Sequence, residues 1–96
     1  MTRQNIMEAS AEVTIPNKLG LHARAAALLR ENAQAFKCDI KIIKEHMEAD
    51  AKSLLGLLAL GAARGSVITI AANGEDAARA VETLKELVEN GFNEEE

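Results

Sequence analysis

The amino-acid sequence predicts an α+β fold, an open-faced two-layer sandwich in which helices cover one face of a single sheet. Three observations predict it. Apolar residues switch along the chain between the alternation typical of strands and the spacing typical of helices, in the order β-α-β-β-α-β-α. The 96 residues suffice for one domain. Hydrophobic residues make up 48% of the chain but aromatic residues only 2%, so small aliphatic side chains must form the core and allow close packing of helices on a sheet.

Four segments have the alternating pattern or the β-branched composition of strands, and these are residues 11–15, 39–44, 47–51 and 66–72. Residues 16–20 include a proline and a glycine, which end the first strand. Glu45 and His46 are expected to form the turn between the second and third strands. The Asn-Gly pair at 73–74 closes the fourth strand.

Three segments repeat apolar residues at helical spacing, and these are residues 23–35, 54–60 and 75–90. Ser53 directly precedes the second helix and is a natural N-cap, because its hydroxyl can accept a hydrogen bond from an unpaired backbone N–H. Gly91 fits the left-handed position after the last helix, and Phe92 is expected to pack back on Leu87. The helices should therefore begin and end close to these residues.

The domain organisation predicted from these elements is one folded unit over residues 11–92. Residues 1–10 are expected to form a flexible N-terminal segment, and residues 93–96 a loose acidic tail. We find no internal repeat and no linker in the sequence.

Composition excludes several classes of function. The net charge is −4 and no basic stripe with interleaved aromatic residues is present, which argues against binding of nucleic acid. The single cysteine, Cys38, excludes an internal disulfide and offers no paired-cysteine spacing for zinc, which argues against a metal site. The longest apolar run, residues 54–63, is too short to span a bilayer. Since nothing resembles an export signal, we expect a cytoplasmic protein without membrane insertion.

A histidine at the predicted start of the first helix is the candidate functional residue. His22 stands in the run Gly20-Leu21-His22-Ala23-Arg24. The first turn of a helix presents unpaired backbone N–H groups and the positive end of the helix dipole, so this position suits an anion. We therefore predict a phosphate-carrying histidine, with the backbone N–H groups of Ala23 and Arg24 and the Arg24 guanidinium in contact with the phosphate. The structural alternative is an ordinary surface histidine at a helix cap.

Three separated motifs carry a resemblance to a known family, and they are Gly20-Leu21-His22-Ala23-Arg24, Lys52-Ser53-Leu54-Leu55-Gly56 and Gly74-Glu75-Asp76. In these motifs the chain resembles the HPr family, the histidine-containing phosphocarrier proteins of the phosphoenolpyruvate-dependent phosphotransferase system. The resemblance covers residues from about 11 to 92. It implies a four-stranded antiparallel sheet in the order 1-4-2-3 with three helices on one face. It also implies a relay component with a phosphohistidine intermediate rather than a stand-alone enzyme, and a carrier that needs no metal and no bound cofactor.

The resemblance implies a role for each candidate site residue. His22 would accept a phosphoryl group on Nδ1 from phosphorylated enzyme I and pass it to an enzyme IIA-type acceptor, with Arg24 stabilising the phosphate. Ser53 would be a regulatory site for an HPr kinase/phosphorylase. The apolar residues that would dock the partner proteins of a monomeric carrier are Leu54, Leu55 and Leu58. Position 25 departs from the commonest family pattern, because Ala25 stands where proline usually follows.

Two alternatives remain beside a general HPr of sugar transport. The run at residues 17–20 and the ending Asn90-Gly91-Phe92 with its acidic tail resemble NPr, the carrier of the nitrogen-related branch. A regulatory binding module of the same fold that is not phosphorylated would use Arg24 and the leucines but not His22. Phosphoryl uptake by His22 in the presence of enzyme I distinguishes a carrier from such a module.

Overall fold

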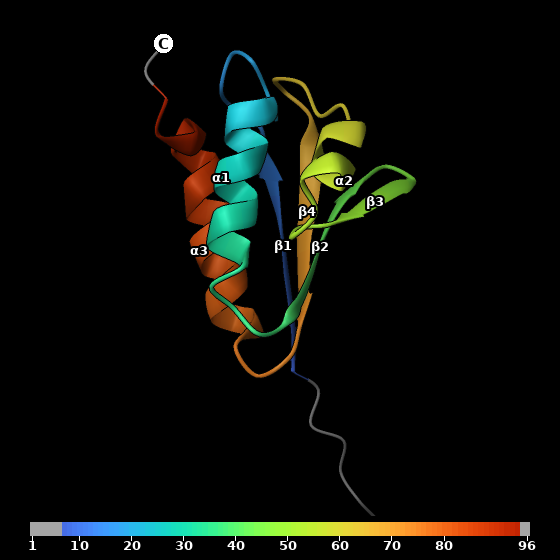
Figure 1. Ribbon diagram of the computed structural model, residues 1–96, viewed down its shortest axis with the longest axis vertical. Helices are drawn as coiled ribbons and strands as arrows, with labels where there is room; N and C mark the ends of the chain where they lie inside the picture. The colour runs from blue at the N-terminus through green and yellow to red at the C-terminus, as the bar shows by residue number, and fades with distance from the viewer. Residues whose placement is uncertain (1–6, 95–96) are drawn as a thin grey trace, which may run out of the picture.

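The sheet and its helices are arranged as the sequence predicts. A computed structural model describes residues 7–94 and shows three helices on one face of a four-stranded antiparallel sheet in the order β1-β4-β2-β3 (Figure 1). The elements are β1 (Glu8–Thr14), α1 (Ala23–Ala33), β2 (Asp39–Lys44), β3 (Met47–Asp50), α2 (Leu54–Ala59), β4 (Val67–Asn73), α3 (Ala77–Glu89) and a short 3-10 helix, η1 (Gly91–Asn93). The predicted α+β class and strand order are both confirmed.

The core lies between the sheet and the helices. On the central strand β4, Ile68 and Ile70 are fully buried, and antiparallel pairing sets Val13 of β1 opposite the first and Ile42 of β2 opposite the second. The helices bury one face each against this layer. Their buried residues are Ala25, Ala26, Leu29 and Ala33 of α1, Leu57 of α2, and Ala77, Ala80, Val81, Leu84, Leu87 and Val88 of α3.

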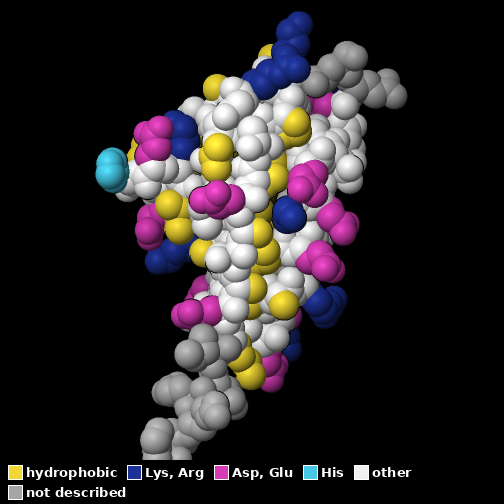
Figure 2. Space-filling view, turned by 180° about the vertical axis from the view of Figure 1, so that it is seen from behind, with side chains coloured by type: hydrophobic (Ala, Val, Ile, Leu, Met, Phe, Trp, Pro, Cys, Tyr) yellow, Lys and Arg dark blue, Asp and Glu magenta, His cyan; other side chains and the backbone are white. Residues whose placement is uncertain are grey.

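The other face of the sheet carries no helix. Figure 2 shows this side, where hydrophobic side chains lie in a column along the middle and acidic side chains lie on the flanks. The residues of β4 that point there alternate with the core residues, so that Val67 is exposed while Thr69 and Ala71 are half-buried. This alternation is the reason why the sheet has one buried and one open face.

The first strand begins earlier than predicted. Residues 8–10, which were expected to belong to a flexible N-terminal segment, pair with residues 71–73 of β4. The sequence signal is weak there because Ala9 is the only apolar residue among Glu8, Ala9 and Ser10. The rest of the predicted N-terminal segment, residues 1–6, lies outside the described residues. The predicted start of the domain, residue 11, therefore lies at least three residues too late in the sequence.

The last helix begins two residues later than predicted because of Asp76. Its carboxylate accepts hydrogen bonds from the backbone N–H groups of Lys37 and Cys38, at 2.9 and 3.0 Å, and so ties the start of α3 to the loop before β2. The hydrogen bond from Lys37 is the main cause that lowers the pKa of Asp76. Burial, and then Asp76, raise the pKa of the Cys38 thiol to about 11, so this thiol is unreactive at neutral pH.

After α3 the chain turns back toward the sheet. Gly91 adopts the predicted left-handed conformation with φ of 64°, and Phe92 is buried at 3% exposure. Glu94, two positions after Phe92, is held against the domain by contacts with Asn17 and His22. The prediction of a loose tail from residue 93 is therefore wrong for Glu94, whereas residues 95–96 lie outside the described residues.

Candidate functional site

Two backbone hydrogen bonds hold the loop before α1 in place. Gly20 donates its backbone N–H to the carbonyl of Asn17 at 3.1 Å, and Leu21 donates to the carbonyl of Ala62, beyond the end of α2, at 2.8 Å. Leu21 is also buried at 5% exposure. These contacts hold the residue that follows, His22, at a defined place in the fold.

The structure places His22 at the N-cap of α1, where its sequence position predicts it. Its backbone is extended, with φ of −82° and ψ of −177°, and its carbonyl accepts the first helical hydrogen bond from the N–H of Ala26 at 2.7 Å. The ring nitrogen Nδ1 accepts a hydrogen bond from the backbone N–H of Arg24 at 3.3 Å. The side chain is 27% exposed. Nδ1 therefore faces the first turn of the helix, and the ring remains accessible.

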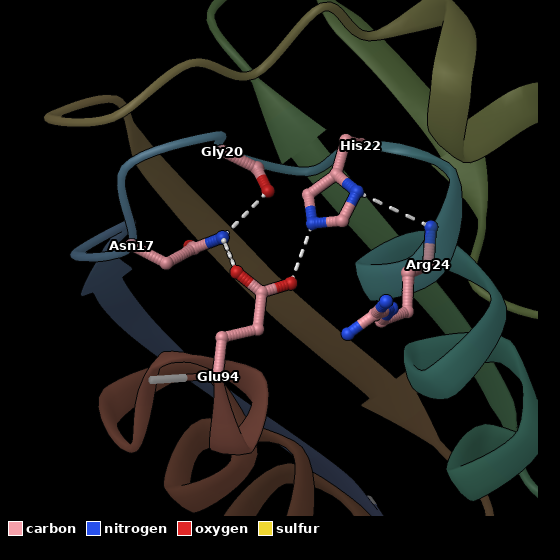
Figure 3. Close-up of polar contacts among 5 residues, drawn as sticks. All are labelled: Asn17, Gly20, His22, Arg24 and Glu94. Carbon is pink, nitrogen blue, oxygen red and sulfur yellow. Dashed lines mark hydrogen bonds and ion pairs between the residues drawn. The ribbon is translucent and has the colours of Figure 1, made fainter. Parts of the chain in front are cut away.

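The other ring nitrogen contacts a glutamate from the far end of the chain. Nε2 of His22 lies 2.5 Å from Oε2 of Glu94, although the two residues are 72 positions apart. The second carboxylate oxygen of Glu94 accepts a hydrogen bond from Nδ2 of Asn17 at 3.1 Å (Figure 3). The Glu94 side chain is only 11% exposed. The glutamate is therefore held by two partners at the edge of the site.

Asn17 organises this edge of the site from within the protein. It is 1% exposed, and its Nδ2 also donates to the carbonyl of Gly20 at 2.8 Å. Both partners of Nδ2, the carbonyl of Gly20 and the carboxylate of Glu94, are acceptors. A reversed amide would place Oδ1 against two oxygens, so the contacts determine its orientation.

The hydrogen bonds to the ring select one tautomer of neutral His22. The carboxylate of Glu94 can only accept, so Nε2 carries the proton. The backbone N–H of Arg24 can only donate, so Nδ1 presents its lone pair. Both contacts therefore favour the tautomer whose Nδ1 is a nucleophile.

Two charged groups of opposite sign, the Glu94 carboxylate and the Arg24 guanidinium, lie near the ring (Figure 3). The hydrogen bond with His22 is the main cause that lowers the pKa of Glu94, and Asn17 and the charge of Arg24 lower it further. The Arg24 side chain points toward the space beside His22 and Glu94 (Figure 3). At neutral pH the ring is therefore flanked by an ionised carboxylate, with an exposed guanidinium nearby.

The second motif forms the start of α2, which packs beside α1 (Figure 1). Ser53 is its N-cap and accepts a hydrogen bond from the N–H of Gly56 at 3.1 Å, as predicted. Of the three predicted docking leucines, Leu55 is 79% exposed, Leu58 is 36% exposed, and Leu54 is partly buried against the core. Two of the three therefore present an apolar surface to solvent.

Substitution Ser53→Ala is expected to lower the free energy of unfolding by about 1 kcal/mol, because it removes the acceptor for one N–H of α2. Urea unfolding followed by circular dichroism measures the change. The exposed Ser10 of β1, which caps no helix, provides the control as Ser10→Ala. Equal stability of the two variants would contradict the capping role.

The sequence did not predict two residues of the site, Asn17 and Glu94. Asn17 was interpreted as part of a turn and Glu94 as part of an acidic tail, both of which resemble NPr, and neither residue was predicted to lie at the site. The available signal was the turn at Gly91 and the apolar Phe92, which predict that the chain returns to the domain after α3. That signal does not indicate which glutamate meets His22.

Within residues 7–94, no group of three or more His, Cys, Asp and Glu side chains could hold a metal ion. In the same part of the chain no helix has the length and apolar character needed to cross a membrane.

Comparisons with known proteins show the family of the chain. Residues 9–90 match the family described as PTS HPr component phosphorylation site. The chain is 43% identical over 83 residues to a phosphocarrier protein HPr of Xylella fastidiosa strain Temecula1, covering 86% of this chain and 93% of the relative. It is 45% identical over 83 residues to a phosphocarrier protein NPr of Shewanella violacea, covering 86% of this chain and 91% of the relative.

Solved structures show the same likeness. The crystal structure of HPr-C-His from Thermoanaerobacter tengcongensis superposes with a TM-score of 0.88 at 38% identity, over 92% of this chain and 99% of the other. A phosphocarrier protein HPr from Bacillus anthracis superposes with a TM-score of 0.81 at 40% identity, over 84% of this chain and 96% of the other. The chain therefore belongs to the HPr family of phosphocarrier proteins of the phosphotransferase system.

Proposed function

We propose that Nδ1 of His22 is the atom that carries the phosphoryl group. The observation that supports this most directly is the pair of contacts to the ring, which place the proton on Nε2 and the lone pair on Nδ1 at the start of α1. In the transfer, the lone pair of Nδ1 forms a bond to phosphorus. The bond between phosphorus and the donor protein breaks, and its electron pair leaves with the donor. The proton on Nε2 stays in place.

The start of α1 and Arg24 support a phosphate at this position. Once Nδ1 is bonded to phosphorus, its lone pair no longer accepts the N–H of Arg24, which then faces the phosphoryl oxygens. The positive end of the helix dipole lies at the same place. The exposed guanidinium of Arg24 provides a further hydrogen-bond donor, and Ala23 contributes its N–H at the first helical position.

The modest strength of these contacts suits a carrier. Each ~1.4 kcal/mol of extra stabilisation of the phosphorylated form lowers the equilibrium constant for onward transfer tenfold. A solvated helix N-terminus stabilises an anion by only about 0.3–1 kcal/mol. The site has one exposed arginine next to the histidine rather than a buried cage of cations, so it holds the group weakly enough to release it.

We propose enzyme I as the donor and an enzyme IIA-type protein as the acceptor, both docking on the apolar surface of α2. Its exposed residues are Leu55 and Leu58, and α2 packs beside α1, which begins next to His22. Exposed apolar side chains on the helix that packs beside α1 are better explained by a partner surface than by stability of the fold.

Substitution Leu55→Ala is expected to raise the KM for phosphorylated enzyme I several-fold while kcat and stability remain close to those of the wild type. Leu55 is 79% exposed, so its removal changes stability by no more than about 0.5 kcal/mol. The matched control is Val67→Ala, which truncates an apolar side chain that is 52% exposed on the open face of the sheet. An unchanged KM for Leu55→Ala, or the same rise for both variants, argues against docking on α2.

For the branch, we propose a general HPr of sugar transport, because the Lys52-Ser53 pair resembles that branch. The alternative, a carrier of the nitrogen-related branch, is favoured by the NPr of Shewanella violacea, which is 45% identical to this chain. The test mixes the protein with phosphoenolpyruvate and enzyme I of either branch, and then with the corresponding enzyme IIA. Faster transfer through the sugar-type proteins supports the first assignment, and faster transfer through the nitrogen-type proteins supports the second. Absence of phosphate on the protein with both active enzymes contradicts a carrier and favours a regulatory module.

We also propose Ser53 as a regulatory phosphorylation site. Its hydroxyl is half-buried at the N-terminus of α2, next to the proposed docking leucines. A phosphate there adds negative charge to the docking surface. Incubation with HPr kinase and ATP followed by peptide mapping tests the assignment, and a digest without modified Ser53 contradicts it.

A further inference from the structure

We propose that Glu94 is a positioning residue for phosphoryl transfer, which fixes the tautomer of His22 and faces the positive charge that forms on the ring. This inference rests on the proposed role of His22. Glu94 touches Nε2 and not Nδ1, so it lies on the side of the ring away from the atom that would bind phosphorus. It therefore acts through His22 and does not contact the transferred group.

The geometry gives Glu94 a defined position. Its two carboxylate oxygens have different partners, Nε2 of His22 at 2.5 Å and Nδ2 of Asn17 at 3.1 Å. Asn17 is itself buried and held to the carbonyl of Gly20. Since the buried Phe92 lies only two positions before Glu94, the backbone that carries the glutamate is also anchored. A carboxylate held in this way fixes the orientation of the imidazole, in addition to placing a negative charge beside it.

The charge of the ring changes during the transfer. Neutral His22 with a proton on Nε2 becomes a phosphoimidazolium when Nδ1 binds phosphorus, because the lone pair is used and the proton is retained. The positive charge is shared by both ring nitrogens, and the carboxylate of Glu94 lies against one of them. Glu94 remains ionised near pH 7, since its hydrogen bonds to His22 and Asn17 lower its pKa. It therefore stabilises the state after attack more than the state before it.

Two substitutions of Glu94 separate the tautomer effect from a simple loss of contact. Glu94→Ala removes the acceptor and leaves Nε2 to water. In Glu94→Gln the amide oxygen is drawn to the Nδ2 group of Asn17, so the amide NH2 faces the ring and requires Nε2 to accept. The proton then belongs on Nδ1, where it meets the N–H of Arg24. The conservative substitution is thus expected to be the more harmful one.

The experiment combines ring 15N chemical shifts of the unphosphorylated protein with single-turnover phosphoryl uptake from enzyme I. We expect the Nε2–H tautomer in the wild type and a shift toward Nδ1–H in Glu94→Gln. At saturating donor, uptake should be about tenfold slower in Glu94→Ala and slower still in Glu94→Gln, tenfold being about 1.4 kcal/mol. Glu86→Gln, which removes the same charge from the exposed side of α3, is expected to match the wild type.

The outcomes distinguish this inference from the proposed function. If the wild type takes up phosphate on His22 and both Glu94 variants keep its rate and its tautomer, the inference is wrong and the proposed function stands. Slower uptake with an unchanged tautomer in Glu94→Gln also overturns it, because the glutamate then acts on the fold or on docking. If the wild type takes up no phosphate, the proposed function itself fails.

Discussion

Substitution His22→Ala is expected to abolish the acid-labile phosphate that the protein acquires from phosphoenolpyruvate and enzyme I. The substitution removes the imidazole nitrogen that is proposed to accept the phosphoryl group. The two groups that hydrogen-bond to the ring are the Glu94 carboxylate and the Arg24 N–H, and neither is an imidazole. The loss should be complete within detection, as measured by incorporation of 32P and by gel shift.

The chain contains its own control for this substitution. It has two histidines, and His46 lies exposed in the turn between β2 and β3. His46→Ala should acquire phosphate at the rate of the wild type. The His22 variant should also stay folded, since loss of its capping interaction costs about 1 kcal/mol. Phosphate on a folded His22→Ala protein would place the acceptor elsewhere and overturn the assignment.

Substitution Gly20→Ala is expected to have the largest effect on stability among the residues of the site. Gly20 has φ of +67°, and a Cβ atom at this position would lie 2.6 Å from the carbonyl oxygen of Ala62 and 2.9 Å from Cα of Ala63. The left-handed conformation alone costs alanine roughly 1–2 kcal/mol. Displacing backbone atoms adds about 1–3 kcal/mol. The carbonyl of Ala62 also accepts the N–H of Leu21 and so holds the loop that carries His22. Displacing this carbonyl should therefore lower phosphoryl uptake as well.

Gly61→Ala separates the two contributions. Gly61 has nearly the same backbone conformation, with φ of +59°, but a Cβ atom there would meet nothing within 4 Å. Urea unfolding of both variants should therefore show a clearly larger loss of stability for Gly20→Ala. Similar losses in the two variants would mean that the close approach to Ala62 does not matter, and that the conformation explains the whole effect.

Most of the fold could be predicted from the sequence because its elements have strong local signals. The strand at Asp39–Lys44 was predicted with its observed bounds, since alternating isoleucines and a following turn define it. Ser53 and Gly91 marked helix ends through capping chemistry, which depends on neighbouring residues only. The start of β1 was missed because residues 8–10 are held by pairing with β4 and not by their own pattern.

Only those residues of the candidate site that are close together in the sequence could be predicted. His22 and Arg24 are neighbours at the start of a helix, so one short motif places them together. Asn17 and Glu94 join the site through contacts across 77 and 72 positions of the chain. Such contacts follow from the packing of α3 and from the turn at its end, and no short pattern contains them. The acidic tail was therefore interpreted as solvated charge, although one of its residues meets the histidine.

In the proposed mechanism the two nitrogens of the His22 ring have separate roles. On the Nδ1 side the start of α1 and Arg24 would provide weak, exposed contacts for a phosphate. On the other side Glu94, held by Asn17, keeps the ring in a single orientation. An exposed acceptor nitrogen on a ring of fixed orientation favours transfer of the group without trapping it.

The most direct test of this account is the position of the phosphorus atom on the imidazole ring of His22. The measurement is long-range 1H–15N correlation of the protein after phosphorylation by enzyme I and phosphoenolpyruvate. The account predicts phosphorus on Nδ1, with the proton still on Nε2 beside Glu94. Phosphorus on Nε2 would contradict it, because the Glu94 carboxylate lies at that nitrogen.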